Sequence, residues 1–230
     1  MNNSYYLPVH GHEVAVLPDN PVYAVTDLVF QRGHMWSQFR EEILSNRLYK
    51  DTIMFDYLSS MKKERDFKTL KSVIKERIDR YSLPGPENTD LVLHVRLGDI
   101  MEGVPGPPHE GGTLSKKTYE INRYSKLKDL DTFFIGRNRV STLKISRVIV
   151  VTALHFGTDK SKGWYKQTPY SMSESLKLLN TIKNQVTEMG HEFLIQSNVN
   201  IDKDICYMVQ SKLFVRGISQ LGKLIKLCKL

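Results

Sequence analysis

The chain of 230 residues contains only two cysteines, Cys206 and Cys228, and both fall in stretches whose pattern predicts helices. A small fold held together by several disulfides is therefore excluded. A single bridge between the two cysteines is one alternative. The simpler interpretation, which we favour, is that both cysteines are core thiols in a reducing compartment.

Long hydrophobic runs are also missing from the sequence. No uninterrupted apolar segment approaches the roughly 20 residues that a helix needs to span a bilayer. The first residues, "MNNSYYLPVHGHEV", lack the basic region followed by an apolar region that marks a secretory signal. We therefore expect a soluble, cytoplasmic protein with no membrane span.

Several motifs that carry chemistry are absent as well. The sequence has no P-loop, no G-x-G-x-x-G, no G-x-S-x-G and no paired C-x-x-C. His10, His12 and Glu13 look like metal ligands, but no further ligand cluster accompanies them, so we expect no metal. Any phosphate binding must therefore depend on arginines and helix N-termini, and no cofactor is expected.

The charge of the chain suits an anionic ligand without indicating a nucleic acid. The formal net charge is +8, which favours a nucleotide or another anion and also serves solubility. Charged runs such as "MKKERDFKTLKSVIKERIDR" mix both signs, as a solvated helical face does. Because the sequence lacks the dense alternation of basic and aromatic residues found in nucleic-acid grooves, we expect no nucleic acid partner.

The last two thirds of the chain alternate between strand-like and helix-like pieces. The predicted strands are "DLVLHVRL", "RVIVVTAL", "EFLIQS" and "LFVRG". The predicted helices run from about 173 to 189, over "DKDICYMVQSK" and over "SQLGKLIKLCKL", with Ser171 and Glu174 forming a capping box at the first. This order predicts an α/β fold: a Rossmann-like parallel sheet with flanking helices.

The first third of the chain has a less regular pattern. "HEVAVL" and "PVYAVTDLVF" are candidate short strands, and 36–81 is helical in pattern, with Leu70, Val73, Ile74 and Ile78 on one face. The breaker-rich "SLPGPENTD" then predicts a boundary between two lobes, 1–83 and 90–230. Within the second lobe, "EGVPGPPHEGGT" predicts a loop, and 114–145 is ambiguous apart from a candidate edge strand at "DTFFI".

Polar residues gather where the predicted strands end. Ligands of parallel sheets bind outside the carboxyl ends of the strands. The residues at or just past these ends are His94, Arg96, Asp99, Ser197, Asn198, Arg216 and Ser219. The fork of Arg96 suits a phosphate, and Gly98 permits close backbone approach. The alternative is that Arg96 and Asp99 pair at a strand end while His94 is packed in the core.

A second candidate anion site lies in "LFVRGISQLGKLI". A strand ends there at Arg216 and Gly217, and a helix begins near Ser219. A serine cap, free backbone N–H groups and the positive end of a helix dipole attract anions. The alternative is that Ser219 caps its own helix and does nothing more, although one helix end can do both.

Two of these peptides carry a resemblance to a known family. "HVRLGD", from His94 to Asp99, resembles the His-x-Arg-x-Gly-Asp peptide of the α1,2-, α1,6- and protein O-fucosyltransferase superfamily. "DICYMVQSKLFVRGISQ" resembles a later peptide of the same family. The resemblance spans about 90–230. It implies a GT-B arrangement of two Rossmann-like lobes, with a donor lobe at 90–230 and a reduced acceptor-side lobe at 1–83.

The resemblance also implies roles for single residues. Arg96 would bind the β-phosphate of the donor and stabilise the departing diphosphate, and His94 would contact the phosphate or sugar. Asp99, Glu102 and His34 are the candidates for the general base. The residues expected to bind the nucleotide donor are Gly98, Ser197, Asn198, Asp204, Arg216, Gly217, Ser219 and Gln220.

The reaction that the resemblance implies is metal-independent transfer of fucose or a related sugar to a glycan hydroxyl, from GDP-fucose or a related GDP-sugar. The expected partners are thus a nucleotide sugar and a glycan acceptor. Two alternatives stay open at this point. One is a nucleotide-sugar-binding module without catalysis, and the other is a nucleic-acid-binding protein.

Overall fold

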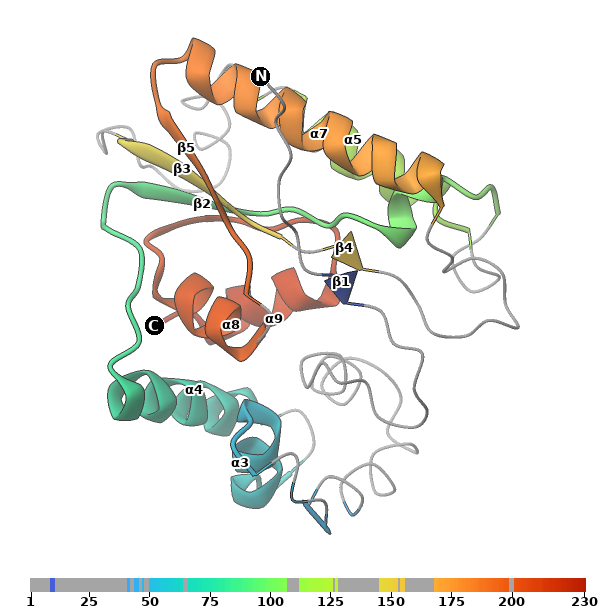
Figure 1. Ribbon diagram of the computed structural model, residues 1–230. Coiled ribbons are helices and arrows are strands. Elements are labelled where there is room, and N and C mark those ends of the chain that lie inside the picture. The colour runs from blue at the N-terminus through green and yellow to red at the C-terminus, as the bar shows by residue number, and fades with distance from the viewer. Residues whose placement is uncertain are drawn as a thin grey trace. The chain divides into compact units, whose positions relative to one another are not determined.

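A computed structural model describes most of the chain and divides it into two compact units (Figure 1). The described residues are 9–10, 41, 44–45, 47, 50–63, 66–106, 112–125, 127, 145–152, 154–155, 168–198 and 201–230. Unit 1 comprises Met1–Glu13, Glu87–Ser197 and Lys212–Ile218, and unit 2 comprises Val14–Pro86, Asn198–Ser211 and Ser219–Leu230. The predicted breaker falls where the chain passes from Pro86 to Glu87. Two segments of the predicted donor lobe, Asn198–Ser211 and Ser219–Leu230, belong to unit 2. The division into a donor lobe and an acceptor-side lobe stays a prediction.

Unit 1 is built on a parallel sheet of four strands. The strands are β2 (Asp90–His94), β3 (Arg147–Val151), β5 (Glu192–Gln196) and β6 (Leu213–Val215). They lie in the order β5-β3-β2-β6, and every pair is parallel. The predicted α/β fold with a parallel sheet is confirmed. Counted along the chain, the strand order is 3-2-1-4, which is the order of the first four strands of a doubly wound sheet.

Two helices pack on one face of this sheet, α5 (Leu114–Tyr124) and α7 (Pro169–Glu188) (Figure 1). The core between them and the sheet contains Leu91, Leu93, Val148, Val150, Tyr124, Leu178, Leu179, Ile182 and Val186, among other buried residues. Unit 1 also holds the one-turn 3-10 helix η2 (Asp99–Glu102) and a short parallel pair, β1 (Val9–His10) with β4 (Leu154–His155). The sheet is therefore covered on this face by the helices that connect β2 to β3 and β3 to β5.

Helix α7 begins earlier than its pattern predicts. The cap is Thr168, whose hydroxyl accepts a hydrogen bond from the Ser171 N–H at 3.0 Å. Pro169 takes the first helical position, where a missing N–H costs nothing. The predicted start near Ser173 and the predicted capping box of Ser171 with Glu174 are therefore wrong, because Ser171 closes the box with Thr168.

Helix α5 was not predicted because its buried face is polar. The buried side chains are Lys117, Glu120 and Tyr124, three to four residues apart. That spacing places them on one face of a helix. A search for apolar periodicity misses such a face, since two of its three members are charged.

The helices of unit 2 include α3 (Ile53–Ser60), α4 (Phe67–Tyr81), α8 (Ile201–Gln210) and α9 (Gln220–Cys228). The predicted apolar face of α4 is confirmed, because Leu70, Val73, Ile74 and Ile78 are all buried. Cys206 on α8 and Cys228 on α9 are free, buried thiols, and burial raises the pKa of each to about 12. The expectation of two core thiols is thus confirmed.

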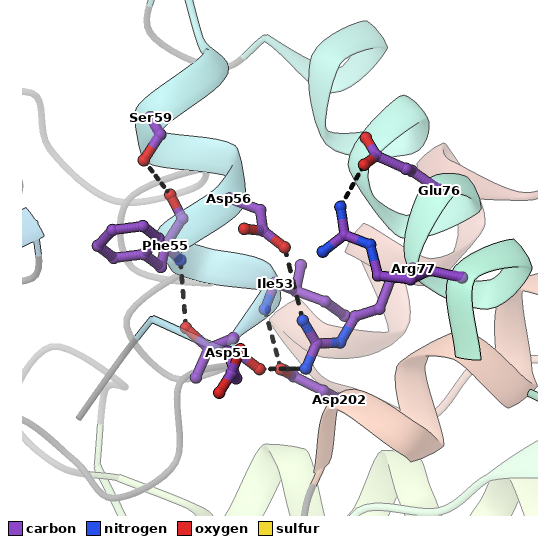
Figure 2. A network of polar contacts seen from close by, with 10 residues as sticks. Asp51, Ile53, Phe55, Asp56, Ser59, Glu76, Arg77 and Asp202 are labelled. Carbon is purple, nitrogen blue, oxygen red and sulfur yellow. Dashed lines mark hydrogen bonds and ion pairs between the residues drawn. The ribbon is translucent and has the colours of Figure 1, made fainter. Parts of the chain in front are cut away.

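A polar network joins three of these helices (Figure 2). The Arg77 guanidinium on α4 donates to the Asp56 carboxylate on α3 at 3.5 Å and to the Asp51 carbonyl. It also lies 4.0 Å from the carboxylate of Asp202 on α8, which accepts the Ile53 N–H at 2.9 Å. Burial raises the pKa of Asp202 to about 6, against the lowering effect of the Ile53 N–H and Arg77. The network explains why α8 belongs to unit 2 although it follows β5 in the chain.

A buried carboxylate anchors the amino end of β2. Asp90 is fully buried and accepts hydrogen bonds from the Arg147 Nε at 2.8 Å, the Arg147 Nη2 at 2.7 Å and the Glu87 N–H at 2.7 Å. Burial by itself raises the pKa of this carboxyl, but the bonds from Arg147 and Glu87 outweigh burial and lower it below 3.8. The ionised form is therefore the one that stabilises unit 1.

The substitution Asp90→Asn is expected to lower the free energy of unfolding at pH 7 by about 2 kcal/mol, because a charge-assisted bond is lost from a buried group. Since the folded-state pKa is depressed, this stability is present above the unfolded pKa of 3.8 and is lost as pH falls through the folded value. Urea unfolding of both proteins at pH 7 and pH 3 checks this. A difference between them that does not shrink in acid would contradict it.

Candidate functional site

The candidate site lies at the carboxyl ends of β2 and β6. These strands are neighbours in the sheet, and the chain order reverses between them, which is where doubly wound sheets bind ligands. Two predicted peptides lie at these ends, one from His94, the last residue of β2, to Asp99 and the other at Arg216 and Gly217, just past β6. The structure brings them together: a Cβ on Gly217 would stand 2.5 Å from the His94 carbonyl oxygen and 3.2 Å from the Arg96 nitrogen.

The Arg96 side chain is held by an ion pair. Its Nη2 donates to the Asp99 Oδ1 at 2.6 Å, and that oxygen also accepts the Ile100 N–H at 2.9 Å. The Arg96 side chain is 19 % exposed and that of Asp99 is 3 % exposed. The pair that the sequence suggested as a structural alternative is therefore formed. A guanidinium has five N–H donors, so pairing with Asp99 and binding an anion are compatible.

Gly98 and His94 set the shape of the site in different ways. Gly98 has φ +84°, a conformation that favours glycine, and its N–H donates to the Ser175 hydroxyl on α7 at 3.1 Å. His94 is buried, and burial together with the Arg96 charge lowers its pKa to about 3. The His94 imidazole is therefore neutral at neutral pH, so it can donate or accept a hydrogen bond without carrying charge.

Glu120 is the main residue of this region that the sequence did not indicate. It lies on α5 with 0 % exposure. Its Oε1 accepts the Arg96 N–H at 2.6 Å, and its Oε2 accepts the Ile218 N–H at 2.8 Å. Burial raises its pKa to about 7, although the two N–H groups, Arg123 and Arg96 all lower it. The only sequence signal for Glu120 is its helical spacing from Lys117 and Tyr124.

The ends of β2, β3 and β5 are joined by hydroxyl groups. The Ser197 hydroxyl, just past β5, donates to the Thr152 carbonyl at 2.5 Å. The Thr152 hydroxyl donates to the Val95 carbonyl at 2.7 Å, just past β2. Ser197, predicted to contact the nucleotide, thus lies at this edge of the sheet and already uses its hydroxyl proton.

The other predicted donor ligands belong to unit 2. Asp204 is buried and accepts hydrogen bonds from the Asn198 N–H at 3.1 Å and from the Asn198 side-chain amide. The Ser219 hydroxyl accepts the Gly222 N–H at 2.9 Å and so caps α9, of which Gln220 is the first residue. Capping by Ser219 is confirmed, and the donor-binding roles of these four residues stay predictions.

The candidates for the general base are placed only in part. Asp99 is paired with Arg96, and the Glu102 carboxylate accepts the Thr168 hydroxyl at 2.5 Å. His34 lies outside the described residues, as do His12 and Glu13 and the predicted strands at "HEVAVL", "PVYAVTDLVF" and "DTFFI". Among the described residues, no three His, Cys, Asp or Glu side chains gather as metal ligands would.

No helix in the described part of the chain combines the length and the apolar composition needed to cross a bilayer. No model of a known protein family matches the sequence, and comparisons with curated proteins and with solved structures find no similar protein.

Proposed function

We propose that the chain is a metal-independent glycosyltransferase with a GT-B-like fold. It would move fucose or a related sugar from a GDP-sugar to a glycan hydroxyl. The observation that supports this most is the placement of Arg96. This residue of the His-x-Arg-x-Gly-Asp peptide follows β2 at the reversal point of the sheet, with its guanidinium held at 2.6 Å by Asp99.

The chemistry of sugar transfer gives Arg96 its task. The acceptor oxygen forms a bond to the anomeric carbon while the bond from that carbon to the diphosphate oxygen breaks. The electron pair of the broken bond stays on the diphosphate, and the acceptor proton goes to a general base. A guanidinium fixed beside the departing oxygen stabilises charge that grows in the transition state.

The positive charge needed at the diphosphate can come from the protein alone. Arg96 supplies a permanent charge with a planar fork of donors that matches phosphate oxygens. The ion pair with Asp99 holds the side chain before a ligand arrives, so less side-chain entropy is lost on binding. The proposed reaction therefore proceeds without magnesium.

A thermal-shift panel of GDP, UDP, ADP and CMP, each with and without magnesium, tests the proposal. A ligand that binds only the native state at 100 times its Kd adds about 2.7 kcal/mol to the stability of that state. We expect GDP to raise the melting temperature most, by the same amount with or without magnesium. A panel in which no nucleotide raises it would overturn the proposal.

Two further results would point to the alternatives. Binding of GDP without turnover of any GDP-sugar, whether to an acceptor or to water, would identify a nucleotide-sugar-binding module. Steeply salt-dependent binding of oligonucleotides would identify a nucleic-acid-binding protein, because such binding releases counterions.

A further inference from the structure

The Glu120 carboxylate occupies the position of an anion at the reversal point of the sheet. Its two oxygens accept the N–H groups of Arg96 and Ile218 at 2.6 Å and 2.8 Å. These N–H groups follow β2 and β6, the two strands between which the chain order reverses. At this edge of doubly wound sheets, backbone N–H groups commonly bind a ligand phosphate. Here a side chain of the protein takes two of them.

The backbone is tightly packed around the Glu120 carboxylate. Gly217 brings the β6 end so close that an added Cβ would clash with Glu120 Oε1 and with the His94 carbonyl. One turn along α5, the Tyr124 hydroxyl donates to the same His94 carbonyl at 2.6 Å. Helix α5 therefore bonds to the backbone at the ends of both strands through two side chains.

These contacts fix the position of Arg96. Its backbone is fixed by Glu120 and its guanidinium by Asp99, each through a bond of 2.6 Å. A side chain held at both ends loses little freedom when it meets a ligand, and its direction depends on both partners.

We propose that Glu120 is a positioning residue of the site. It holds the backbone of Arg96 against the β6 end so that the guanidinium meets the diphosphate of a nucleotide ligand. The inference rests on the proposed function for the identity of that ligand. The bonds to Arg96 and Ile218 do not depend on the ligand and are tested separately.

The first test needs no ligand. In a full chain labelled with nitrogen-15 and carbon-13, the Arg96 and Ile218 amide protons are expected to exchange slowly with solvent. Both amide shifts are expected to follow the titration of the Glu120 carboxyl carbon. The other groups near Glu120 are Arg96, Arg123 and Tyr124. The variant Glu120→Gln, which lacks the carboxyl, assigns the titration. Fast exchange of both amides would contradict the bonds from Arg96 and Ile218 to Glu120.

The second test is a double-mutant cycle on GDP binding. Glu120→Gln keeps the shape of the side chain but replaces one acceptor oxygen with an NH₂ group, which faces a backbone N–H. We expect Glu120→Gln to weaken GDP binding about tenfold when Arg96 is intact and less than about twofold in an Arg96→Lys background. Equal losses in the two backgrounds would mean that Glu120 does not act through Arg96.

The matched control is Asp90→Asn. It makes the same carboxylate-to-amide change in a fully buried residue of β2, at the opposite end of the strand. This control is expected to lower stability without changing the affinity for GDP. If Glu120→Gln does not fold, Glu120→Asp takes its place in the cycle with the same expected pattern. A wild-type chain that binds no nucleotide would overturn the proposed function and the positioning role. The amide measurement would still decide whether Glu120 bonds the Arg96 and Ile218 N–H groups.

Discussion

Replacing Gly217 with alanine is expected to lower the free energy of unfolding of unit 1 by about 3 kcal/mol, because the new methyl group has no space. Its Cβ would stand 2.5 Å from the His94 carbonyl oxygen and 3.2 Å from the Arg96 nitrogen. Both atoms are backbone, and the third neighbour is the carboxylate of buried Glu120. Relief requires β6 to move away from β2, which breaks the strand pairing.

A second glycine separates this crowding from the general cost of losing a glycine. Gly190, after α7, has φ +79°, but a Cβ there would meet nothing within 4 Å. Gly190→Ala therefore carries only the conformational cost of a left-handed residue, about 1 kcal/mol. Urea unfolding followed by circular dichroism compares the two variants at pH 7. If Gly217→Ala is as mild as Gly190→Ala, the close approach of β6 to β2 is wrong.

The second large effect is expected at Arg77 in unit 2. Arg77→Ala is expected to lower the free energy of unfolding by about 3–5 kcal/mol at pH 8, because it leaves a buried carboxylate without its counter-charge. Asp202 is 2 % exposed and lies 4.0 Å from the guanidinium, and Asp56 and the Asp51 carbonyl lose a donor as well. Arg77 joins three helices, so its loss affects the whole unit.

The pH dependence of Arg77→Ala follows from Asp202. Burial raises the folded-state pKa of Asp202 from 3.8 to about 6, so the folded state gains stability by holding a proton on this carboxyl. That stability is present below pH 3.8 and is lost as pH rises through 6. Removing Arg77 takes away a charge that lowers this pKa. The variant is therefore expected to lose more stability at pH 8 than at pH 5, with Asp202→Asn restoring part of the loss at pH 8.

Urea unfolding at the two pH values measures this, with Arg80→Ala as the control. Arg80 lies on the same helix, but its ion pair with Glu76 is exposed on both sides. Exposed pairs contribute little to stability, so the Arg80→Ala midpoint is expected to stay near that of the wild type at both pH values. An Arg77→Ala loss that is the same at pH 5 and pH 8 would contradict the account of Asp202.

The strands of the sheet could be predicted because they are locally encoded. Strands β2 and β3 are runs of buried apolar residues, and the alternation of strands with helices indicated parallel pairing. The order β5-β3-β2-β6 was not predicted, since it depends on contacts between residues far apart in the sequence. The membership of α8 in unit 2 was missed for the same reason, because it follows from the bonds of Asp202 to Ile53 and Arg77.

Some residues of the candidate site could be predicted from the sequence and others could not. The sequence predicted that His94, Arg96 and Gly217 lie at the candidate site, because residues at the end of a parallel strand lie at the carboxyl edge of the sheet. Glu120 was missed because it acts on backbone N–H groups, which no sequence motif displays, and because it lies on a helix whose buried face is polar. The closeness of Gly217 to Glu120 is likewise a property of the fold alone.

The central claim is that Arg96 binds the diphosphate of a nucleotide ligand at the carboxyl end of β2. Titration calorimetry of GDP without metal tests it most directly, with the wild type, Arg96→Lys and the control Arg147→Lys. Arg147 is also partly exposed and paired with an aspartate, but it lies at the amino end of the neighbouring strand. We predict that GDP binds about tenfold more weakly to Arg96→Lys than to the wild type, because the bidentate fork is lost. The affinity of Arg147→Lys for GDP is predicted to equal that of the wild type. Equal affinity of all three proteins for GDP would contradict the claim.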